Sequence, residues 1–235
     1  MTGVKKSGHP ITLFMHQGKT DRALELLDSA LQRAEDQEEI LQQIIDAHLA
    51  QGAYEHAAEA ILKLCELDER LDDGTIYQLA LCFDFMHQYD RAVETFDRFI
   101  EREPYNALLW YQKAAFALRL NKEEEALEYF DWATTADDEF HAAHFEIGRI
   151  HERNDRLIDA MNAYRLSISE EVPSGYIYFR IGMIEQELGS LNAALRAFDR
   201  AVEVEPELED VYLERANVLC ELDRHEEAIS DYKKV

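Results

Sequence analysis

The chain has 235 residues, with 24 Lys and Arg against 49 Asp and Glu, and a formal net charge of −25 at pH 7. Such an acidic chain is a poor binder of phosphate backbones, so nucleic acids and anionic membranes are not expected as partners. Cys65, Cys82 and Cys220 are widely separated within apolar stretches. This spacing excludes a disulfide framework and favours buried thiols in a reducing compartment.

The N-terminus lacks the apolar run of a signal peptide, because Lys5 and Lys6 are followed by a polar stretch that ends in Pro10. Charged residues interrupt every apolar segment well before the roughly 20 residues that a membrane span requires. These features predict a cytoplasmic protein that does not enter the membrane.

The sequence repeats with a period of about 34 residues, and an alanine marks each repeat. The alanines are Ala23, Ala57, Ala92, Ala126, Ala160, Ala194 and Ala228, at spacings of 34 or 35 residues. A large apolar residue follows each of them one helical turn later, at Leu27, Ile61, Phe96, Phe130, Tyr164, Phe198 and Tyr232. Small residues recur twelve positions before five of the alanines, at Ala80, Ala114, Gly148, Gly182 and Ala216. Such a period predicts stacked pairs of helices that share one continuous core.

This pattern resembles the tetratricopeptide repeat, in which small residues at places eight and twenty accompany an aromatic residue at twenty-four and a proline at thirty-two. Pro104 and Pro206 occupy the last of these places. The resemblance implies an all-α fold, a right-handed superhelical solenoid of antiparallel helix pairs that forms a single domain over residues 1–235. The seven repeats would be 4–37, 38–72, 73–106, 107–140, 141–174, 175–208 and 209–235, the first degenerate and the last truncated.

Individual repeats depart from the pattern in ways that predict local structure. Gly8 and Pro10 interrupt the first helix of the first repeat, so this helix is expected to shorten to about Ile11–Gln17. The second repeat has one extra residue, which we place in the loop around Glu69–Asp72. Asn121 and Asp223 precede glutamate-rich stretches, and they are expected to cap the helices that follow.

The last repeat stops at Val235, partway through or just at the end of its second helix. Val218, Leu219, Ile229 and Tyr232 are therefore expected near an open end of the solenoid. Two interpretations remain open. Either the chain is a fragment of a longer protein, or this end docks on a second copy and forms a homodimer.

The residues that carry chemistry do not form a catalytic or metal-binding constellation. His141 and His144 are three residues apart, but His151 lies seven residues beyond His144, about 10 Å along a helix, which is too far to share a metal ion. Packing between helices is the favoured interpretation of these histidines. The cysteines are expected to be core thiols rather than nucleophiles, and there is no glycine-rich phosphate loop. We therefore expect neither an enzyme nor a bound cofactor or metal.

The resemblance implies that the first helix of each repeat faces a concave groove. Its fifth place holds an aromatic row, Tyr77, Tyr111, Phe145 and Phe179, which Phe85 and Tyr176 extend. Aromatic side chains are common at interface hot spots, so the row is a candidate contact for a partner. The alternative is that the rings fill space against neighbouring helices.

The same mapping places Arg119, Arg149, Arg153 and Arg180 on the groove face. Arginine binds carboxylate and phosphate groups through paired hydrogen bonds, so this cluster is a candidate site for an acidic group of a partner. The alternative is internal pairing with Glu146, Glu152 or Glu187. The Lys and Asn residues with which chaperone-binding members of the family clamp a terminal carboxylate are missing. The sequence thus predicts a non-catalytic scaffold that binds a protein or peptide, with self-association through the C-terminal repeat as the alternative.

Overall fold

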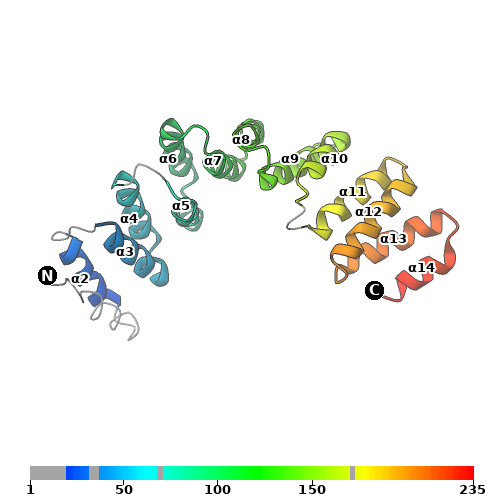
Figure 1. The fold of residues 1–235 in the computed structure, drawn as a ribbon, viewed down its shortest axis with the longest axis horizontal. Helices are drawn as coiled ribbons and strands as arrows, with labels where there is room; N and C mark the ends of the chain where they lie inside the picture. The colour runs from blue at the N-terminus through cyan, green and yellow to red at the C-terminus, as the bar shows by residue number, and fades with distance from the viewer. Residues whose placement is uncertain (1–19, 32–36, 68–70, 170–172) are drawn as a thin grey trace, which may run out of the picture. The chain divides into compact units, whose positions relative to one another are not determined.

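The computed structural model describes residues 20–31, 37–67, 71–169 and 173–235, and in these ranges the chain is all α-helical (Figure 1). It divides into two compact units, Met1–Glu101 and Arg102–Val235, which are described separately. The prediction of a single domain stays a prediction. The predicted helix Ile11–Gln17 lies outside the described residues. No helix in the described ranges is long and apolar enough to cross a membrane.

Within the described residues, consecutive helices pack as antiparallel pairs, one pair to each repeat after the first. The first unit contains α2 (Thr20–Leu31), α3 (Gln37–Gln51), α4 (Tyr54–Leu67), α5 (Asp73–Met86) and α6 (Tyr89–Arg102). The second unit contains α7 (Ala107–Arg119), α8 (Glu123–Ala136), α9 (His141–Arg153), α10 (Leu157–Leu166), α11 (Gly175–Glu187), α12 (Leu191–Val204), α13 (Glu209–Glu221) and α14 (His225–Tyr232).

Loop lengths and prolines agree with the predicted repeats. Residues 68–72 separate α4 from α5, one residue more than the loop 103–106 between α6 and α7, so the extra residue of the second repeat falls in this loop. Pro104 and Pro206 each lie just beyond the end of a second helix, α6 and α12 respectively. A proline here ends the helix without removing a hydrogen bond from its interior.

The periodic residues form the core, as the sequence predicts. The alanine of every repeat is buried, with at most 1% of its surface exposed. The large residue one turn later is equally buried in the first six repeats, whereas Tyr232 in the last repeat is 42% exposed. Because each helix pair shares this arrangement, the core continues from one repeat to the next within each unit.

The glycines at the eighth place are explained by an aromatic ring that covers them. A Cβ atom added to Gly182 would lie 2.4 Å from the ring of Phe198, and one added to Gly148 would lie 2.7 Å from the ring of Tyr164. Both distances are too short for real contacts, so the ring approaches the helix backbone closely only because the side chain is absent. Repeats with alanine at this place, such as Ala114 beside Phe130, pack their rings at a distance that allows a Cβ atom.

The prediction that Asn121 and Asp223 cap the second helices is wrong. The N-cap residues of α8 and α14 are Lys122 and Arg224, and neither makes a side-chain cap hydrogen bond. Asn121 and Asp223 instead adopt positive φ angles of 59° and 58° in the turn between the paired helices. The same turn place recurs in the other repeats, where it is held by Gly52, His87, Asp155 and Gly189, all with positive φ. Asn, Asp and Gly are the residues that tolerate this left-handed conformation.

Candidate functional site

Three of the four predicted groove arginines meet at a hollow in the second unit. Arg149 and Arg153 come from α9 and Arg180 from α11, and the hollow has a volume of about 320 Å³. Arg119, at the exposed C-terminal end of α7, is not among its lining residues. The other side chains that line the hollow are Leu118, Glu146, Ile150, Glu152, Tyr164 and Tyr176. The hollow thus brings together the ninth and thirteenth places of the fifth repeat, which are Arg149 and Arg153, and the second and sixth places of the sixth repeat, which are Tyr176 and Arg180.

Arg180 is fixed by a network that connects three helices. Its guanidinium donates to both carboxylate oxygens of Glu152, and the hydroxyl of Tyr164, on α10, donates to Glu152 Oε2 at 2.7 Å. Burial works to lower the pKa of Arg180, but the hydrogen bonds and charge of Glu152 outweigh burial and raise it. Burial, with the hydrogen bond to Glu152, also raises the pKa of the Tyr164 phenol. The network therefore stays ionised at Arg180 and protonated at Tyr164 near neutral pH.

Arg149 and Arg153 are held much more loosely. Arg149 directs Nη1 to both oxygens of Glu146 at 3.1 Å, and Arg153 directs Nη2 to Glu123 on α8. The arginine side chains are 55% and 59% exposed. The carboxylates of Glu146 and Glu123 are less exposed, at 18% and 31%, so water reaches and screens these pairs mainly from the arginine side.

Each arginine that lines the hollow thus pairs with an acidic side chain of the same unit, which is the predicted alternative to a free binding site. Two of the acids are the expected Glu146 and Glu152, and the third is Glu123, which the sequence did not indicate. Among the described residues of the second unit, Glu187 does not pair with these arginines. Glu123 lies in the preceding repeat, 30 residues from Arg153, so no helical spacing relates them.

The aromatic row of the second unit combines packing with partial exposure. The rings of Tyr111, Phe145 and Phe179 each lie within 6.0 Å of the buried ring at the twenty-fourth place of the same repeat. Tyr176 contacts both Phe145 and Phe179, at 6.3 and 6.4 Å between ring centroids, and 43% of its surface is exposed. These rings therefore fill space along the helices and still present a surface beside the arginines. Tyr77 belongs to the first unit, where it is 53% exposed.

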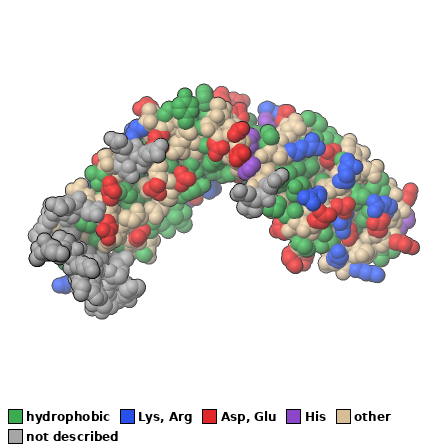
Figure 2. All heavy atoms as spheres, viewed as in Figure 1, with side chains coloured by type: hydrophobic (Ala, Val, Ile, Leu, Met, Phe, Trp, Pro, Cys, Tyr) green, Lys and Arg blue, Asp and Glu red, His purple; other side chains and the backbone are tan. Residues whose placement is uncertain are grey.

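Figure 2 shows basic and acidic side chains interspersed over the part of the second unit that holds α11–α14 in Figure 1.

One buried ion pair lies among the last three helices, α12, α13 and α14. Arg215 on α13 makes two hydrogen bonds, of 2.7 and 2.8 Å, to Asp231 on α14, and a further one of 2.8 Å to Asp199 on α12. These bonds to Asp231, against the opposing effect of burial, raise the pKa of Arg215. The pairing connects the last three helices and serves the fold.

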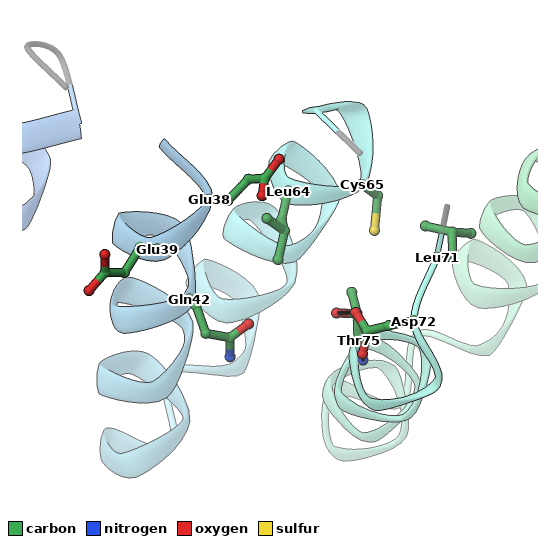
Figure 3. Close-up of a pocket in the computed structure, with 8 residues that line it drawn as sticks. All are labelled: Glu38, Glu39, Gln42, Leu64, Cys65, Leu71, Asp72 and Thr75. Atoms are coloured by element: carbon green, nitrogen blue, oxygen red, sulfur yellow. Dashed lines mark hydrogen bonds between the residues drawn. The ribbon is translucent and has the colours of Figure 1, made fainter. Parts of the chain in front are cut away.

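A second hollow, of about 290 Å³, lies in the first unit (Figure 3). It is lined by Glu38, Glu39 and Gln42 from α3, by Leu64 and Cys65 from α4, and by Leu71, Asp72 and Thr75 around the start of α5. Asp72 is the N-cap of α5 and accepts hydrogen bonds from the backbone N–H, at 3.0 Å, and the hydroxyl of Thr75. Its carboxylate therefore has a structural task, and we do not assign this hollow a ligand.

The three histidines of α9, which the sequence assigns to packing between helices, are half-buried. His144 Nε2 lies 3.2 Å from the carbonyl oxygen of Asp138, and His141 Nδ1 lies 3.1 Å from that of Leu166. No group of three or more His, Cys, Asp and Glu suited to a metal ion occurs within the described residues.

Cys65 and Cys82 are buried and Cys220 is half-buried, and none of the three forms a disulfide. Burial raises the pKa of Cys82 to about 11. Near neutral pH this thiol is therefore protonated and a poor nucleophile.

The prediction that four apolar side chains lie near an open end of the solenoid is only partly correct. Val218 and Leu219 are 0% and 3% exposed and belong to the core between α12, α13 and α14. They point into their own helix pair, so the end of the chain leaves them covered. Ile229 and Tyr232 on α14 are 53% and 42% exposed, as predicted.

Comparisons with known proteins agree with this architecture. The sequence matches the family described as Tetratricopeptide repeat over residues 11–71, 77–138, 117–175 and 179–235. No curated protein matches it. Among solved structures it is similar to YrrB, described as a TPR protein with an unusual peptide-binding site, at 21% identity and a TM-score of 0.60 over 76% of this chain and 91% of that chain.

Two other solved structures are similar. MamA has 19% identity and a TM-score of 0.59 over 74% of this chain and 94% of that chain. The C-terminal part of a TPR repeat-containing protein from Cytophaga hutchinsonii has 16% identity and a TM-score of 0.64 over 81% of this chain and 76% of that chain. At these identities the likeness shows the fold alone. Because the family match extends over most of the sequence, the chain belongs to the tetratricopeptide repeat family, whose members are protein-interaction modules.

Proposed function

We propose that this chain is a non-catalytic, cytoplasmic scaffold that binds an acidic peptide segment of a partner protein in the hollow between α9 and α11. The observation that carries the proposal is the pair of loosely held arginines, Arg149 and Arg153, on the same hollow. The family is typically non-catalytic, and the three cysteines, which form no disulfide, suit a reducing compartment.

The two arginines retain donors for a ligand. Each guanidinium has five N–H donors, and the hydrogen bonds of Arg149 and Arg153 engage a single nitrogen of each. A carboxylate of the partner can therefore bind the remaining edge of either guanidinium through two parallel hydrogen bonds. Since Glu146 and Glu123 are themselves only 18% and 31% exposed, the ligand binds the unused edge of each guanidinium while the internal pairs stay in place.

Arg180 has a different role in this proposal. Its pairing with Glu152 is less exposed, at 29% and 18% of the two side chains, and the Tyr164 hydroxyl holds Glu152 in place. Breaking that arrangement would leave a partly buried carboxylate without its partner, which is costly. Arg180 is therefore a fixed part of the floor of the hollow, and Arg149 and Arg153 contact the ligand.

The neighbouring rings supply apolar area for the same segment. Arg149 lies over the ring of Phe145, 5.9 Å from its centroid, and Phe145 contacts the exposed Tyr176. Aromatic side chains bury a large area at low entropic cost. A segment with an acidic residue next to an apolar one fits this arrangement.

The test is selection from a random peptide library displayed against the full chain. Selected peptides should be enriched in Asp and Glu, and Arg149→Gln or Arg153→Gln should weaken their binding about tenfold in fluorescence anisotropy. Arg200→Gln is the matched control, because Arg200 on α12 is 58% exposed, also pairs with an acid three residues away, and does not line the hollow. Peptides without acidic residues, or equal binding to the Arg149→Gln variant and the wild type, would contradict the proposal.

A second candidate function, self-association through α14, is favoured by one specific observation. Ile229 and Tyr232 are 53% and 42% exposed, whereas Leu195 and Phe198, at the same places of the preceding repeat, are 7% and 0% exposed. Light scattering over a tenfold concentration range distinguishes the two. Self-association predicts a mass that rises with concentration in the wild type and not in Ile229→Gln, whereas a constant monomer mass excludes it.

A further inference from the structure

Helix α5 in the first unit presents a stripe of large apolar side chains to solvent. Tyr77, Leu81 and Phe85 are spaced by four residues, and 53%, 46% and 55% of their surfaces are exposed. Residues at this spacing lie on one face of a helix, and the stripe extends about 12 Å along the axis. We refer to these three residues as the α5 stripe.

The stripe is a property of this helix and not of the repeat. It occupies the fifth, ninth and thirteenth places, and in the other described first helices these places hold at least one small or polar residue. They are Gln42, Asp46 and Ala50 in α3; Tyr111, Ala115 and Arg119 in α7; Phe145, Arg149 and Arg153 in α9; Phe179, Met183 and Glu187 in α11; and Leu213, Asn217 and Glu221 in α13. Packing of the repeat therefore does not require three large apolar residues here.

The surroundings of the α5 stripe are acidic. Neither α3 nor α5 contains Lys or Arg. Asp73 lies four residues before Tyr77 and Asp84 three residues after Leu81, so both carboxylates belong to the same side of α5 as the stripe. Over residues 37–67 and 71–101 the chain has 3 basic side chains against 13 acidic ones. A ligand of this surface is therefore attracted by positive charge.

One end of the stripe is held in place before any ligand binds. The ring of Phe85 stacks on that of Tyr54, the first residue of α4, with centroids 4.4 Å apart and planes at 3°. Phe85 nevertheless remains 55% exposed. Since this ring is already ordered, binding to it costs little conformational entropy.

We infer that the α5 stripe is a docking surface for a partner helix that is amphipathic and basic. A helix with apolar residues at i, i+4 and i+7 matches the stripe in length and spacing, and Lys or Arg on its flanks match the acidic rim. This surface selects a charge opposite to the one selected by the arginine-lined hollow of the second unit. The two surfaces are independent, and neither proposal depends on the other.

The test uses a synthetic helical probe and the full chain. The probe is a labelled peptide of about 18 residues, roughly 27 Å long as a helix, with Leu on one face and Lys on the other. The matched probe carries Glu in place of every Lys. Fluorescence anisotropy gives the dissociation constant of each probe for the wild type, for Leu81→Gln and for Ile158→Gln. Ile158, on α10 of the second unit, is 54% exposed and controls for loss of an exposed apolar side chain elsewhere.

The Lys probe should bind the wild type and Ile158→Gln equally, and Leu81→Gln should bind it about tenfold more weakly. The Glu probe should bind the wild type about tenfold more weakly than the Lys probe. Arg149→Gln should leave binding of the Lys probe unchanged, which separates this surface from the hollow. Equal binding to Leu81→Gln, or equal binding of the two probes, would overturn the inference. So would a rise in mass with concentration that Leu81→Gln abolishes, because the occupant would then be a second copy of the chain.

Discussion

Close contact between one aromatic ring and one helix backbone sets the geometry of two repeats. Gly148 and Gly182 allow the rings of Tyr164 and Phe198 to lie directly on α9 and α11. In the fifth repeat this contact also has a consequence for the candidate site, because it leaves the Tyr164 hydroxyl within reach of Glu152. Packing in the core and position in the hollow are thus linked through a single side chain.

Gly182→Ala should destabilise the protein. The added Cβ atom would lie 2.4 Å from the Phe198 ring, and this ring, 0% exposed, has little room to move. Overpacking of this kind costs about 1–3 kcal/mol, which outweighs the better helix propensity of alanine. Thermal unfolding followed by circular dichroism should show a lower midpoint. The double variant Gly182→Ala with Phe198→Leu should regain part of the loss, and an unchanged midpoint in the single variant would contradict the argument.

At the scale of the element, each helix pair depends on one left-handed turn residue. The place is held by Gly, His, Asn or Asp in different repeats, and its φ lies between 54° and 75°. A residue with a Cβ atom pays a steric cost there that glycine avoids. The turn, and not a side-chain cap, therefore fixes where α8, α10 and α14 begin.

Substitutions at Asp155 should reveal this cost. Asp155 has a φ of 59° and is exposed. Asp155→Gly should leave stability unchanged or raise it slightly, whereas Asp155→Val should lower it by about 1–2 kcal/mol, because a β-branched side chain tolerates positive φ poorly. Urea unfolding of both variants measures the difference. Equal stability of the glycine and valine variants would show that the turn is not under this constraint.

The start of α5 depends instead on a side-chain cap. Burial works to raise the pKa of Asp72, but the hydrogen bonds from the Thr75 hydroxyl and backbone N–H outweigh burial and hold the pKa below its ordinary value. The carboxylate therefore stabilises the fold above its unfolded-state pKa of about 4, and this contribution is lost as pH falls through the lower, folded-state value.

Asp72→Asn should change the pH dependence of stability, because asparagine caps a helix without a charge. The wild type should be the more stable of the two at pH 7, and its advantage should shrink below about pH 4. Asp72→Ala should cost about 1 kcal/mol at pH 7 through loss of the cap. Melting curves from pH 3 to 7 test both statements, and a constant difference between the wild type and Asp72→Asn would contradict the assigned role of the charge.

At the scale of the whole molecule, the sequence predicts the packing that recurs from repeat to repeat, and it does not predict a side-chain contact that occurs only once. Helix pairing and the core follow from the period, because the repeats bury the same places, apart from the exposed Ile229 and Tyr232 of the last one. The clustering of Arg149, Arg153 and Arg180 follows for the same reason, since fixed places on consecutive first helices come together. The pairing of Arg153 with Glu123 joins two repeats through one pair of side chains, and no period indicates it.

Two further differences between prediction and structure have other causes. The sequence predicts Asn121 and Asp223 as caps because Asn and Asp are favoured both as N-caps and in left-handed turns, and the sequence alone does not separate the two. Leu81 completes the α5 stripe, but its exposure depends on what the neighbouring helices leave uncovered. The exposed fraction of a side chain is a property of the packed molecule and not of its place in the repeat.

Stability in a repeat protein is a sum of contributions from each repeat and its neighbours, so a local defect should stay local. In hydrogen exchange, Gly182→Ala should speed exchange most in α11 and α12, less in α10 and α13, and not in α3 and α4, which are four repeats away in sequence. Ala57→Gly is the reciprocal control, since Ala57 is 0% exposed and lies in α4. It should speed exchange in α3, α4 and α5 and leave α11 unchanged. If either variant raised exchange uniformly along the chain, the molecule would unfold as one cooperative unit, and nearest-neighbour contacts would not explain its stability.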